Sequence, residues 1–451
     1  MKTVMLFRRD LRLQDNTALL KALKNSDKVI PLFIFTPTQI KDNSYKGMHS
    51  FEFMINSLEE LDKELKKLGS KLHIAYAEPT QVLSQINCDA VYFNKDYTPY
   101  SISRDEAIND IIKVYSYHDA LLNPPQTVLK QDNTPYTIFT PYYNKAKQMP
   151  VKKPQYLTSG LINFITQKLT IQKIPYETTI DEIKKKYLKK NNPKLAVKGG
   201  RTEGLKLLNE LQENKLKQYD EQRDFPNIKG TSLLSAHNKF GTISIREIYH
   251  NTQQNPSFTR QLYWRDFSTQ IAFHFPKVFG NEFQKKFSFV KWDYDEDNFK
   301  KWCLGKTGFP IIDAGMRELN TTGYMHNRVR MIVASFLTKT LHIDWRWGEK
   351  YFAQKLVDYD PCINNASWQW AASTGCDAQP YFRIFNPWRQ QIRFDPECEY
   401  IKKWVEELSN TSYQTIHNLE KQKPLTLLNY PSPIVDYKKE KEETLKRFNI
   451  F

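Results

Sequence analysis

Short apolar stretches alternate with amphipathic stretches over residues 1–120 of the chain. We expect helices at 18–26 and 50–69, and buried strands at 4–7, 29–35, 71–77 and 90–94. Short apolar strands that alternate with helices are typical of a parallel sheet with both faces covered. The pattern therefore predicts a Rossmann-like α/β unit at the N-terminal end.

The pattern changes after this unit. Residues 150–198 hold eleven lysines and four prolines without sustained periodicity, which indicates a connecting segment on the surface. From residue 200 onward the apolar positions follow a period of 3.6, most clearly at 201–216 and 326–341. We predict an α/β domain at 1–125, a connecting segment at 126–198 and an all-helical domain at 199–451.

The turn after the first strand lacks the pattern of a standard dinucleotide site. Residues 7–16 read FRRDLRLQDN, whereas a dinucleotide-binding loop carries GxGxxG so that the pyrophosphate can approach a helix N-terminus. We expect no standard dinucleotide binding there. HExxH, GxSxG and paired Cys/His metal spacings are also missing from the sequence, so we expect no metal site and none of the usual hydrolase or metalloenzyme chemistry.

Composition narrows the choice of partner and compartment. The formal net charge is +16, which suits a polyanion such as nucleic acid, although a lysine-rich composition alone gives the same charge. No run of eighteen apolar residues appears, so no membrane span is expected. The five cysteines form no CxxC pair. We expect a soluble intracellular protein, cytoplasmic or nuclear if eukaryotic.

All nine tryptophans lie in the helical half, from Trp264 onward. Tryptophan usually fills cores, but many aromatic rings in a basic helical domain can also build a stacking pocket for a base or a flavin. Both readings stay open on composition alone.

Several ordered segments closely resemble the photolyase and cryptochrome family. They are FRRDLRLQDNTAL at 7–19, YDEQRDFPNIKGTSLLS at 219–235, LYWRDF at 262–267, GKTGFPIIDAGMRELNTTGYMHNRVRMIVASFL at 305–337, DWRWGEKYF at 344–352 and DYDPCINNASWQWAASTGCDAQPYFRIFNP at 358–387. The resemblance covers nearly the whole chain. It implies an N-terminal α/β domain, a helical domain that binds one FAD per chain, and light as the energy source.

The resemblance assigns a set of residues to FAD. Hydroxyls and N–H groups in the loop at 231–235, before an expected helix, suit a pyrophosphate. Asp358 is expected to pair with Arg330, and Asp360 to accept from the flavin ring. Asn364 would face flavin N5, where plant cryptochromes carry an aspartate, so it favours repair. The full set is Tyr219, Thr231, Ser232, Leu233, Leu234, Ser235, Phe258, Arg265, Arg330, Asp358, Asp360 and Asn364.

Three tryptophans match the family's electron-transfer row from flavin to surface: Trp368, Trp345 and Trp292. Indole is an oxidisable ring, so spaced indoles can relay electrons to a photoexcited, oxidised flavin. Any one of them on its own would be read as core filling.

Residues at the expected lesion pocket favour cyclobutane pyrimidine dimers as substrate. Trp264 and Trp370 would stack on the flipped pyrimidines, and Met331 would contact the dimer. The (6-4) photolyases carry histidines in place of Asn327 and Met331, and this chain does not. Expected catalytic residues are Asn364, Gln261 and Met331, and the expected DNA contacts are Arg223, Gln261, Trp264, Arg265, Asn327, Arg328, Met331, Trp370, Arg383 and Gln390.

Gln261 departs from the family pattern. Cyclobutane photolyases of this type usually carry a glutamate there, whereas (6-4) photolyases resemble this chain at that position. Glutamine can donate and accept hydrogen bonds but supplies no charge. The alternatives are therefore a (6-4) or dual-specificity photolyase, a cryptochrome without repair, and a flavin electron-transfer protein that binds no DNA.

The family can also carry an antenna chromophore. Tyr100 and Ser101 stand where folate-binding relatives place Asn and Glu, so a deazaflavin or an empty site is favoured over methenyltetrahydrofolate. We expect a monomer that acts on DNA containing pyrimidine dimers.

Overall fold

The structure is a computed structural model that describes residues 1–158, 160, 162–165, 174–188, 190–421 and 429–448. The chain forms two compact units. The first comprises residues 1–193, 197–216 and 232–276, and the second comprises residues 194–196, 217–231 and 277–451. The domain boundaries predicted at 125/126 and 198/199 stay a prediction beside this division.

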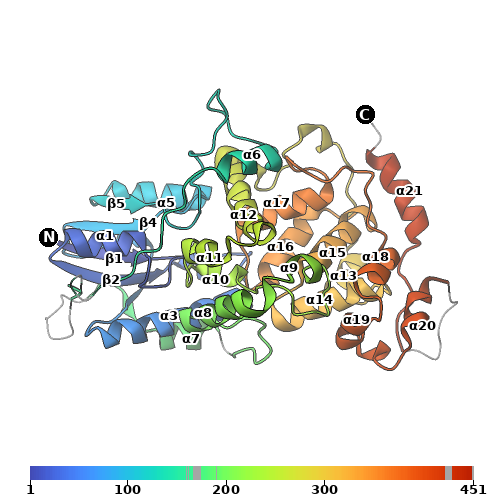
Figure 1. Ribbon diagram of the computed structural model, residues 1–451, viewed down its shortest axis with the longest axis horizontal. Coiled ribbons are helices and arrows are strands. Elements are labelled where there is room, and N and C mark those ends of the chain that lie inside the picture. The colour runs from blue at the N-terminus through green and yellow to red at the C-terminus, as the bar shows by residue number, and fades with distance from the viewer. Residues whose placement is uncertain (159, 161, 166–173, 189, 422–428, 449–451) are drawn as a thin grey trace. The chain divides into compact units, whose positions relative to one another are not determined.

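A six-stranded sheet forms the centre of the first unit (Figure 1). Its order is β5-β4-β1-β2-β3-β6. The first five strands pair in parallel, and β6 pairs antiparallel with β3 at one edge. The strands are β1 (Lys2–Phe7), β2 (Lys28–Phe35), β3 (His73–Tyr76), β4 (Ala90–Asn94), β5 (Val114–Tyr117) and β6 (Glu177–Thr178). The predicted parallel sheet is confirmed, with one antiparallel edge strand added.

The central strands are apolar on both faces. Every residue of β4 is buried, and so is every residue of β2 except Lys28. Such continuous burial is the mark of a parallel sheet covered by helices. The helices of this unit are α1 (Thr17–Asn25), α2 (Pro37–Ile40), α3 (Met48–Lys67), α4 (Pro79–Leu83), α5 (Pro99–Asn109), α6 (Phe139–Ala146), α7 (Ile180–Tyr187), α8 (Arg201–Glu210), α10 (Ser235–Phe240), α11 (Ile245–Thr252) and α12 (Pro256–His274).

The segment expected to be a plain connection contains regular structure. Over 126–198 it holds the helix α6, the strand β6 and the eight-residue helix α7. Thr179 and Glu182 form a capping box at the start of α7, with the Thr179 hydroxyl accepting from the Glu182 N–H. Only Ile183 of α7 is buried, so hydrophobic periodicity could not show this helix. The T-x-x-E cap was the available signal.

The helix predicted at 201–216 divides in two. Helix α8 ends at Glu210, and a π-helical turn follows at Leu211–Lys215. A π-helical turn shifts the side-chain direction by one extra residue, which a 3.6-residue period does not indicate.

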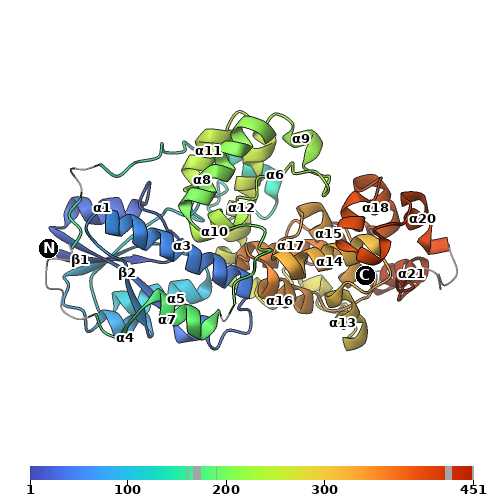
Figure 2. The same cartoon turned by 90° about the horizontal axis from the view of Figure 1, so that it is seen from below.

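Among the described residues of the second unit the regular elements are helices, and α13 to α17 gather together (Figure 2). Its buried core includes Trp302, Trp345 and Trp368. Pro310 and Pro361 stand at the first positions of α14 and α17, where a missing N–H costs nothing. The helices are α9 (Tyr219–Gln222), α13 (Glu296–Leu304), α14 (Pro310–Thr322), α15 (Asn327–Lys339), α16 (Trp345–Lys355), α17 (Pro361–Ala372), α18 (Pro387–Phe394), α19 (Glu399–Trp404), α20 (Tyr413–His417) and α21 (Tyr437–Phe448).

Helices α16 and α17 approach closely at Gly348. A Cβ added there would lie 2.1 Å from Cη2 of Trp368, so only glycine allows this packing. The contact fixes the position of Trp368 against α16.

Candidate functional site

Two neighbouring helices of the second unit carry most of the predicted site residues. Asn327, Arg328, Arg330 and Met331 lie in the first turns of α15. Asn364, Trp368 and Trp370 lie on α17, which contacts α15 directly. The predicted helical domain therefore places these residues on one pair of packed helices.

Arg330 and Asp358 form the ion pair that the sequence predicts. Arg330 Nη2 lies 3.0 Å from Asp358 Oδ2, and Arg330 Nε donates to the Met325 carbonyl at 2.7 Å. Burial opposes the charge on Arg330, but the interactions with Asp358, Tyr324 and Glu318 together outweigh it and raise the pKa of the guanidinium. Asp358 Oδ1 is buried and has no hydrogen-bond partner among the described residues. A buried carboxylate oxygen without a partner is costly unless a ligand donates to it.

Asp360 and Asn364 lie at the start of α17. The Asp360 side chain caps the helix by accepting from the N–H groups of Cys362 and Ile363, at 3.0 and 3.3 Å. Asn364 is 7 % exposed, and its Nδ2 donates to the Glu349 carbonyl at 3.0 Å. Because the amide nitrogen is held in this way, Oδ1 of Asn364 is the atom left to accept from a ligand. This donor and acceptor set fits a flavin ring.

The N-terminal end of α15 presents the predicted lesion contacts. The exposed Asn327 and half-buried Met331 lie on one face, with 3.8 Å between Asn327 Nδ2 and Met331 Sδ. His326 caps the helix by accepting from the Arg328 N–H at 3.2 Å. Burial lowers the pKa of His326 to about 4, so the ring is neutral at physiological pH. The one histidine of this stretch therefore caps the helix through Nδ1 and does not carry the acidic proton of an imidazolium.

Arg328 is an anchored cation at the same end of α15. Its Nη2 lies 2.7 Å from Asp224 Oδ1, and its guanidinium lies 4.4 Å from the ring centroid of Phe394. Asp224 is a residue that the sequence interpretation passed over. The Arg–Asp spacing across a hundred residues gave no signal for it.

Tyr219 and Thr231 lie in the segment that the second unit contributes before residue 232. Tyr219 is 8 % exposed, and Arg223 lies over its ring at 5.6 Å. The Thr231 hydroxyl lies 3.4 Å from the hydroxyl of Tyr324, and burial raises the pKa of Tyr324 to about 12. The tyrosine therefore stays a neutral hydrogen-bonding group. Tyr324 was not predicted.

The rest of the predicted phosphate loop, Ser232 to Ser235, belongs to the first unit. Leu233 adopts a φ of 57°, and the Ser232 hydroxyl accepts from the Leu234 N–H at 3.3 Å. This makes a tight turn directly before α10, as expected from the sequence.

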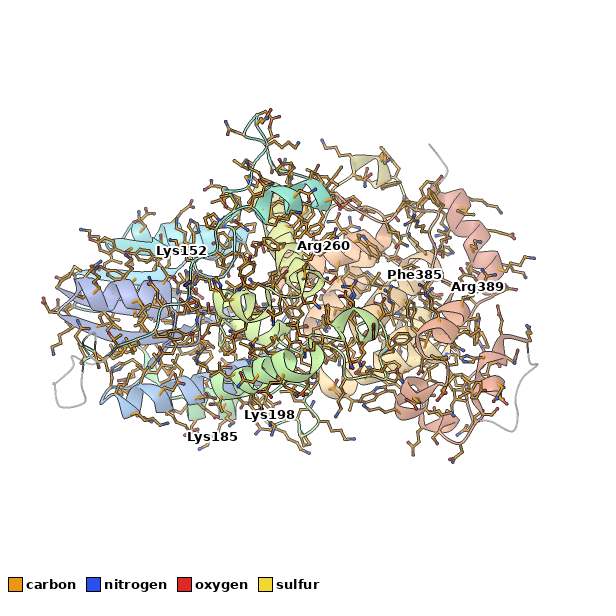
Figure 3. The ribbon with its side chains drawn as sticks, in the orientation of Figure 1. Lys152, Lys185, Lys198, Arg260, Phe385 and Arg389 are labelled. Carbon is orange, nitrogen blue, oxygen red and sulfur yellow. The ribbon has the colours of Figure 1, made fainter. Side chains whose placement is uncertain are left out.

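Helix α12 of the first unit carries Phe258, Gln261, Trp264 and Arg265. Phe258 is buried, whereas Gln261 is exposed and donates from Nε2 to the Ser257 carbonyl at 3.2 Å. Trp264 stacks on Phe139 with ring centroids 3.6 Å apart and an angle of 8° between the planes. One face of the indole is therefore covered by protein. The exposed Arg260, labelled in Figure 3, lies 5.3 Å from the Phe139 ring centroid.

Arg265 lies inside the first unit and not on its surface. Its guanidinium donates to the backbone carbonyls of Ala120 and Asn238, and the residue is 8 % exposed. This placement argues against the expected DNA contact by Arg265, because a buried guanidinium held by two carbonyls cannot reach a phosphate. Its assignment to FAD stays a prediction.

The three tryptophans of the predicted electron row differ in burial as such a row requires. Trp368 and Trp345 are 2 % and 0 % exposed, and Trp292 is partly exposed. Trp345 Nε1 donates to Glu282 Oε1 at 3.5 Å, and the Arg346 guanidinium lies 4.8 Å from the Trp345 ring. The structure thus has two interior rings and one near the surface.

The stretch from Arg383 to α18 supplies exposed polar groups of the second unit. Arg383 and Arg389 are exposed and Gln390 is half-buried; Arg389 is labelled in Figure 3. Trp370 is half-buried, with its ring centroid 6.5 Å from that of Phe385. Arg389 was not among the predicted DNA contacts, although it lies one residue from Gln390.

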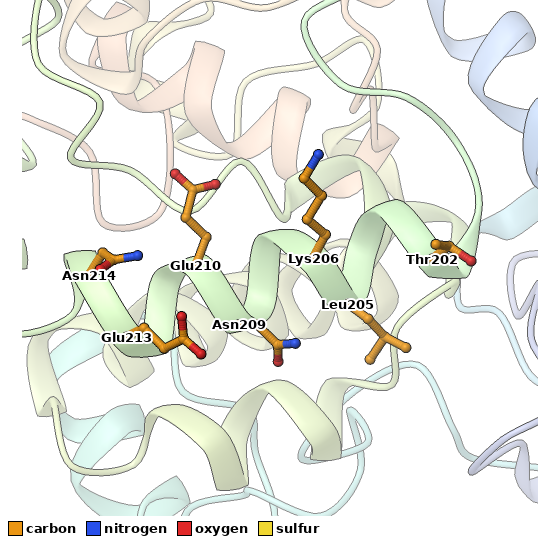
Figure 4. A pocket seen from close by; sticks show the side chains of 7 residues that line it. All are labelled: Thr202, Leu205, Lys206, Asn209, Glu210, Glu213 and Asn214. Carbon is orange, nitrogen blue, oxygen red and sulfur yellow. The ribbon is translucent and has the colours of Figure 1, made fainter.

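Two surface hollows lie elsewhere, along α8 and between α3 and α8. In the first, Lys206 and Glu210 point to one side of the helix, and Leu205, Asn209 and Glu213 point to the other (Figure 4). Side chains that diverge in this way do not make a binding site. Neither hollow includes a residue assigned to FAD or DNA.

The described residues hold neither a cluster of metal ligands nor a membrane-spanning helix. They contain no group of three or more His, Cys, Asp or Glu side chains that could hold a metal ion. They also contain no helix with the length and apolar character needed to cross a membrane.

Comparison with known proteins decides the family. Residues 3–157 match the family described as DNA photolyase, and residues 258–450 match the FAD binding domain of DNA photolyase. A deoxyribodipyrimidine photo-lyase of Alkalihalophilus pseudofirmus is 37 % identical, with 98 % of this chain and 96 % of that protein covered. The chain belongs to the DNA photolyase family.

Solved structures agree with this assignment. An archaeal photolyase from Sulfolobus tokodaii with two FAD molecules is 43 % identical and superposes with a TM-score of 0.90 over 100 % of both chains. A cryptochrome of Synechocystis is 27 % identical, with a TM-score of 0.86 over 99 % of both. The predicted fold class and family are confirmed, and the chain is a photolyase with the family's FAD-binding domain.

Proposed function

We propose that this photolyase repairs cyclobutane pyrimidine dimers in DNA, using light absorbed by one bound FAD. The observation that carries the proposal is the group of residues at the start of α15 and in the segment that leads into α17. Asp358 contributes a buried carboxylate oxygen without a partner among the described residues. Asn327 and Met331 form one face of α15, and the neighbouring His326 is neutral. FAD in its reduced form, when bound, supplies an electron on light absorption.

The protein's part in cofactor binding is to hold and orient. The Arg330–Asp358 pair leaves Asp358 Oδ1 as an acceptor for a bound flavin, and Asp360 in the same segment would accept from the flavin ring as the family resemblance implies. Asn364 offers its carbonyl oxygen because Glu349 holds its Nδ2. Tyr219, Thr231, Ser232 to Ser235 and Phe258 would hold the remainder of FAD, as the family resemblance implies.

Lesion choice follows from what the chain can give the substrate. A reaction that needs a proton donor at the lesion is poorly served by a neutral His326 and by Asn327 and Met331. Splitting of a cyclobutane ring by an electron that afterwards returns to the flavin needs no proton donor. Trp264 and Trp370 offer flat faces for flipped pyrimidines, and Arg223, Arg328, Arg383 and Gln390 offer contacts to the strand.

Two matched oligonucleotides test the substrate. One carries a single cyclobutane thymine dimer and the other a single (6-4) product, and each is illuminated with reduced, FAD-loaded protein. We expect restoration of the first and no change in the second. Restoration of the (6-4) product, or of both lesions, would contradict the proposed substrate. It would favour the (6-4) or dual-specificity alternative that Gln261 suggests.

An antenna chromophore in the first unit is the second part of the proposal. Ser101 is 3 % exposed and Tyr100 is 40 % exposed at the start of α5, and neither supplies the amide and carboxylate expected for a folate. The Sulfolobus tokodaii relative holds two FAD molecules. Chromatography of the pigments released on denaturation should show a flavin-type molecule or FAD alone. Methenyltetrahydrofolate in that extract would refute this part.

A further inference from the structure

Trp368 has ring contacts that lead away from the predicted electron row. Its ring centroid lies 6.2 Å from that of Trp302 and 4.9 Å from that of Phe352. Trp302 is fully buried and donates from Nε1 to the Val333 carbonyl at 3.1 Å. Neither the family resemblance nor the site description gave Trp302 a role.

Further rings continue from Trp302 to the surface of the second unit. Phe299 lies 5.8 Å from Trp302 and 5.1 Å from Trp347, measured between ring centroids. Trp347 lies 5.7 Å from Tyr294, whose exposed fraction is 67 %. The path therefore begins at a buried indole beside Trp368 and ends at a phenol in solvent.

We infer that Trp302, Trp347 and Tyr294 form a second electron-transfer branch that meets the first row at Trp368. The inference rests on the proposed role of Trp368 as electron donor to FAD. Phe299 serves as a packed spacer, because a benzene ring is much harder to oxidise than an indole or a phenol. Trp368 is then a branch point supplied from two sides.

Tyr351 is not the end of this branch, although its ring lies 5.8 Å from Trp302. Oxidation of a phenol requires loss of its proton. The Tyr351 hydroxyl donates to Asn320 Oδ1 at 2.6 Å and to the Cys303 carbonyl at 3.0 Å, and neither is a base. Tyr294 is exposed and can release its proton directly to water, so the oxidation ends there as a neutral tyrosyl radical.

Two tryptophans of the first row, Trp345 and Trp292, have surroundings that make their oxidation less favourable than that of the rings of the second branch. The Arg346 guanidinium lies over Trp345 and opposes a positive charge there. Trp292 packs against Phe448, and its Nε1 is buried without a hydrogen-bond partner among the described residues. Over the part of the chain that the structure describes, no lysine or arginine lies over Trp302, Trp347 or Tyr294.

The electron count closes at every step. Trp368 gives one electron to the light-excited, oxidised cofactor and regains one from Trp302, which regains one from Trp347. Trp347 takes one from Tyr294, whose phenolic proton goes to water and leaves a neutral tyrosyl radical. A thiol reductant in solution returns a hydrogen atom to Tyr294, so the net transfer is one electron from thiol to cofactor.

Electron paramagnetic resonance of oxidised, FAD-loaded protein frozen under blue light tests the branch. We expect a tyrosyl signal in the parent and in the control Tyr413→Phe, which removes another exposed tyrosine. The signal should disappear in Tyr294→Phe and in Trp347→Phe. A tyrosyl signal that persists in Tyr294→Phe would overturn the inference.

Photoreduction rates give a second readout. Trp292→Phe should slow reduction of the cofactor in the presence of thiol without abolishing it, and Trp292→Phe with Trp347→Phe should abolish it. Complete loss in Trp292→Phe alone would also overturn the branch. Trp347 is half-buried, so its replacement is milder for folding than that of the fully buried Trp302.

Two controls separate the branch from the proposed function. Protein reduced with dithionite should repair dimers equally in all these variants, because repair does not use the relay. Absence of repair in every variant and the parent would refute the proposed function while the radical signal still reports the branch. Radical formation that survives Trp368→Phe would refute the shared premise.

Discussion

The two carboxylate oxygens of Asp358 have different surroundings. Oδ2 pairs with Arg330, and Oδ1 is buried without a partner among the described residues. The pairing was expected from the sequence because the family resemblance placed both residues. The orphaned oxygen is a property of the folded chain, since it depends on what surrounds the carboxylate in space.

Asp358→Asn should weaken the binding of FAD. The amide keeps the shape but turns a charged acceptor beside Arg330 into a neutral group, at a cost of about 1–3 kcal/mol. Because about 1.4 kcal/mol is tenfold in affinity, the dissociation constant for FAD should rise by roughly five- to 150-fold. The ratio of flavin to protein after gel filtration measures this. Asp293→Asn, which breaks the more exposed pair with Arg447, should retain FAD; equal retention in both variants would contradict the role of Asp358.

Gln261→Glu should raise the yield of repair per flash. The side chain is exposed on α12, and among the described residues its Nε2 donates to the Ser257 carbonyl; a glutamate gives up this one contact and has room to turn its carboxylate toward solvent. The family's glutamate hydrogen-bonds the dimer, whereas glutamine supplies no charge or proton. Single-flash repair of a dimer oligonucleotide measures the yield. The matched control is Gln254→Glu at another exposed position, and no gain over it would refute the idea.

At the scale of elements, the C-terminal turn of α15 holds a buried lysine. Lys339 is 0 % exposed, and its Nζ lies 2.7 Å from the Ser373 hydroxyl at the end of α17. Burial lowers the pKa of Lys339 to about 7, so the amine is largely neutral above that pH. The contact joins the two helices that carry most of the site.

Lys339→Met should remove a pH dependence of stability. Between pH 7 and about 10.5 the unfolded chain carries a proton on this lysine that the folded protein lacks, so folding stability rises with pH. The slope from one group is about 1.4 kcal/mol per pH unit. Urea unfolding at pH 7.5 and 9 should show the parent gaining stability relative to Lys339→Met. A difference between the two proteins that is the same at both pH values would contradict the lowered pKa; Lys350→Met, at an exposed site, is the control.

The elements that hydrophobic pattern predicted well are those buried on both faces or along one stripe. Strands β1, β2 and β4 and helices α3 and α15 agree with expectation to within two residues. Strand β6 has two polar residues and depends on pairing with β3, and α7 buries one side chain. Neither produces a period that a sequence can show. The π-helical turn after α8 was not predicted either, because a 3.6-residue period does not indicate a π-helical turn.

Some site residues could be predicted from sequence motifs, whereas others depend on contacts that form only in the folded chain. Motif resemblance located the residues of α15 and α17, and the Arg330–Asp358 pair is present as expected. The burial of Arg265 was missed because its partners, the carbonyls of Ala120 and Asn238, come from remote segments. Asp224, Tyr324 and Glu349 were missed because each acts through a contact that only folding creates.

At the scale of the whole molecule, the charge of +16 predicts salt-sensitive binding of DNA. Each phosphate neutralised by lysine or arginine releases condensed counterions, so affinity falls as salt rises. With about four such contacts, the affinity for a dimer-containing duplex should fall roughly a hundredfold between 50 and 200 mM salt. Fluorescence anisotropy measures it, and an affinity independent of salt would refute the electrostatic part. The monomeric state and the intracellular location stay predictions.

The cryptochrome alternative concerns activity and not fold, because a cryptochrome superposes on this chain over 99 % of its length. Asn364 donates to the Glu349 carbonyl, and by the family resemblance it takes the place of the aspartate of plant cryptochromes, which supports the proposal of repair. A photolyase and a cryptochrome share this fold, so an assay of light-driven DNA repair is what distinguishes the two activities.

The most direct test is repair by single flashes. Reduced, FAD-loaded protein is mixed with an oligonucleotide that holds one cyclobutane thymine dimer, and mass-resolved chromatography follows the strand after each flash and in the dark. We predict stepwise conversion of the dimer to two thymines under light and none in the dark. A dimer that persists through saturating flashes, with FAD reduced and the strand bound, would contradict the account.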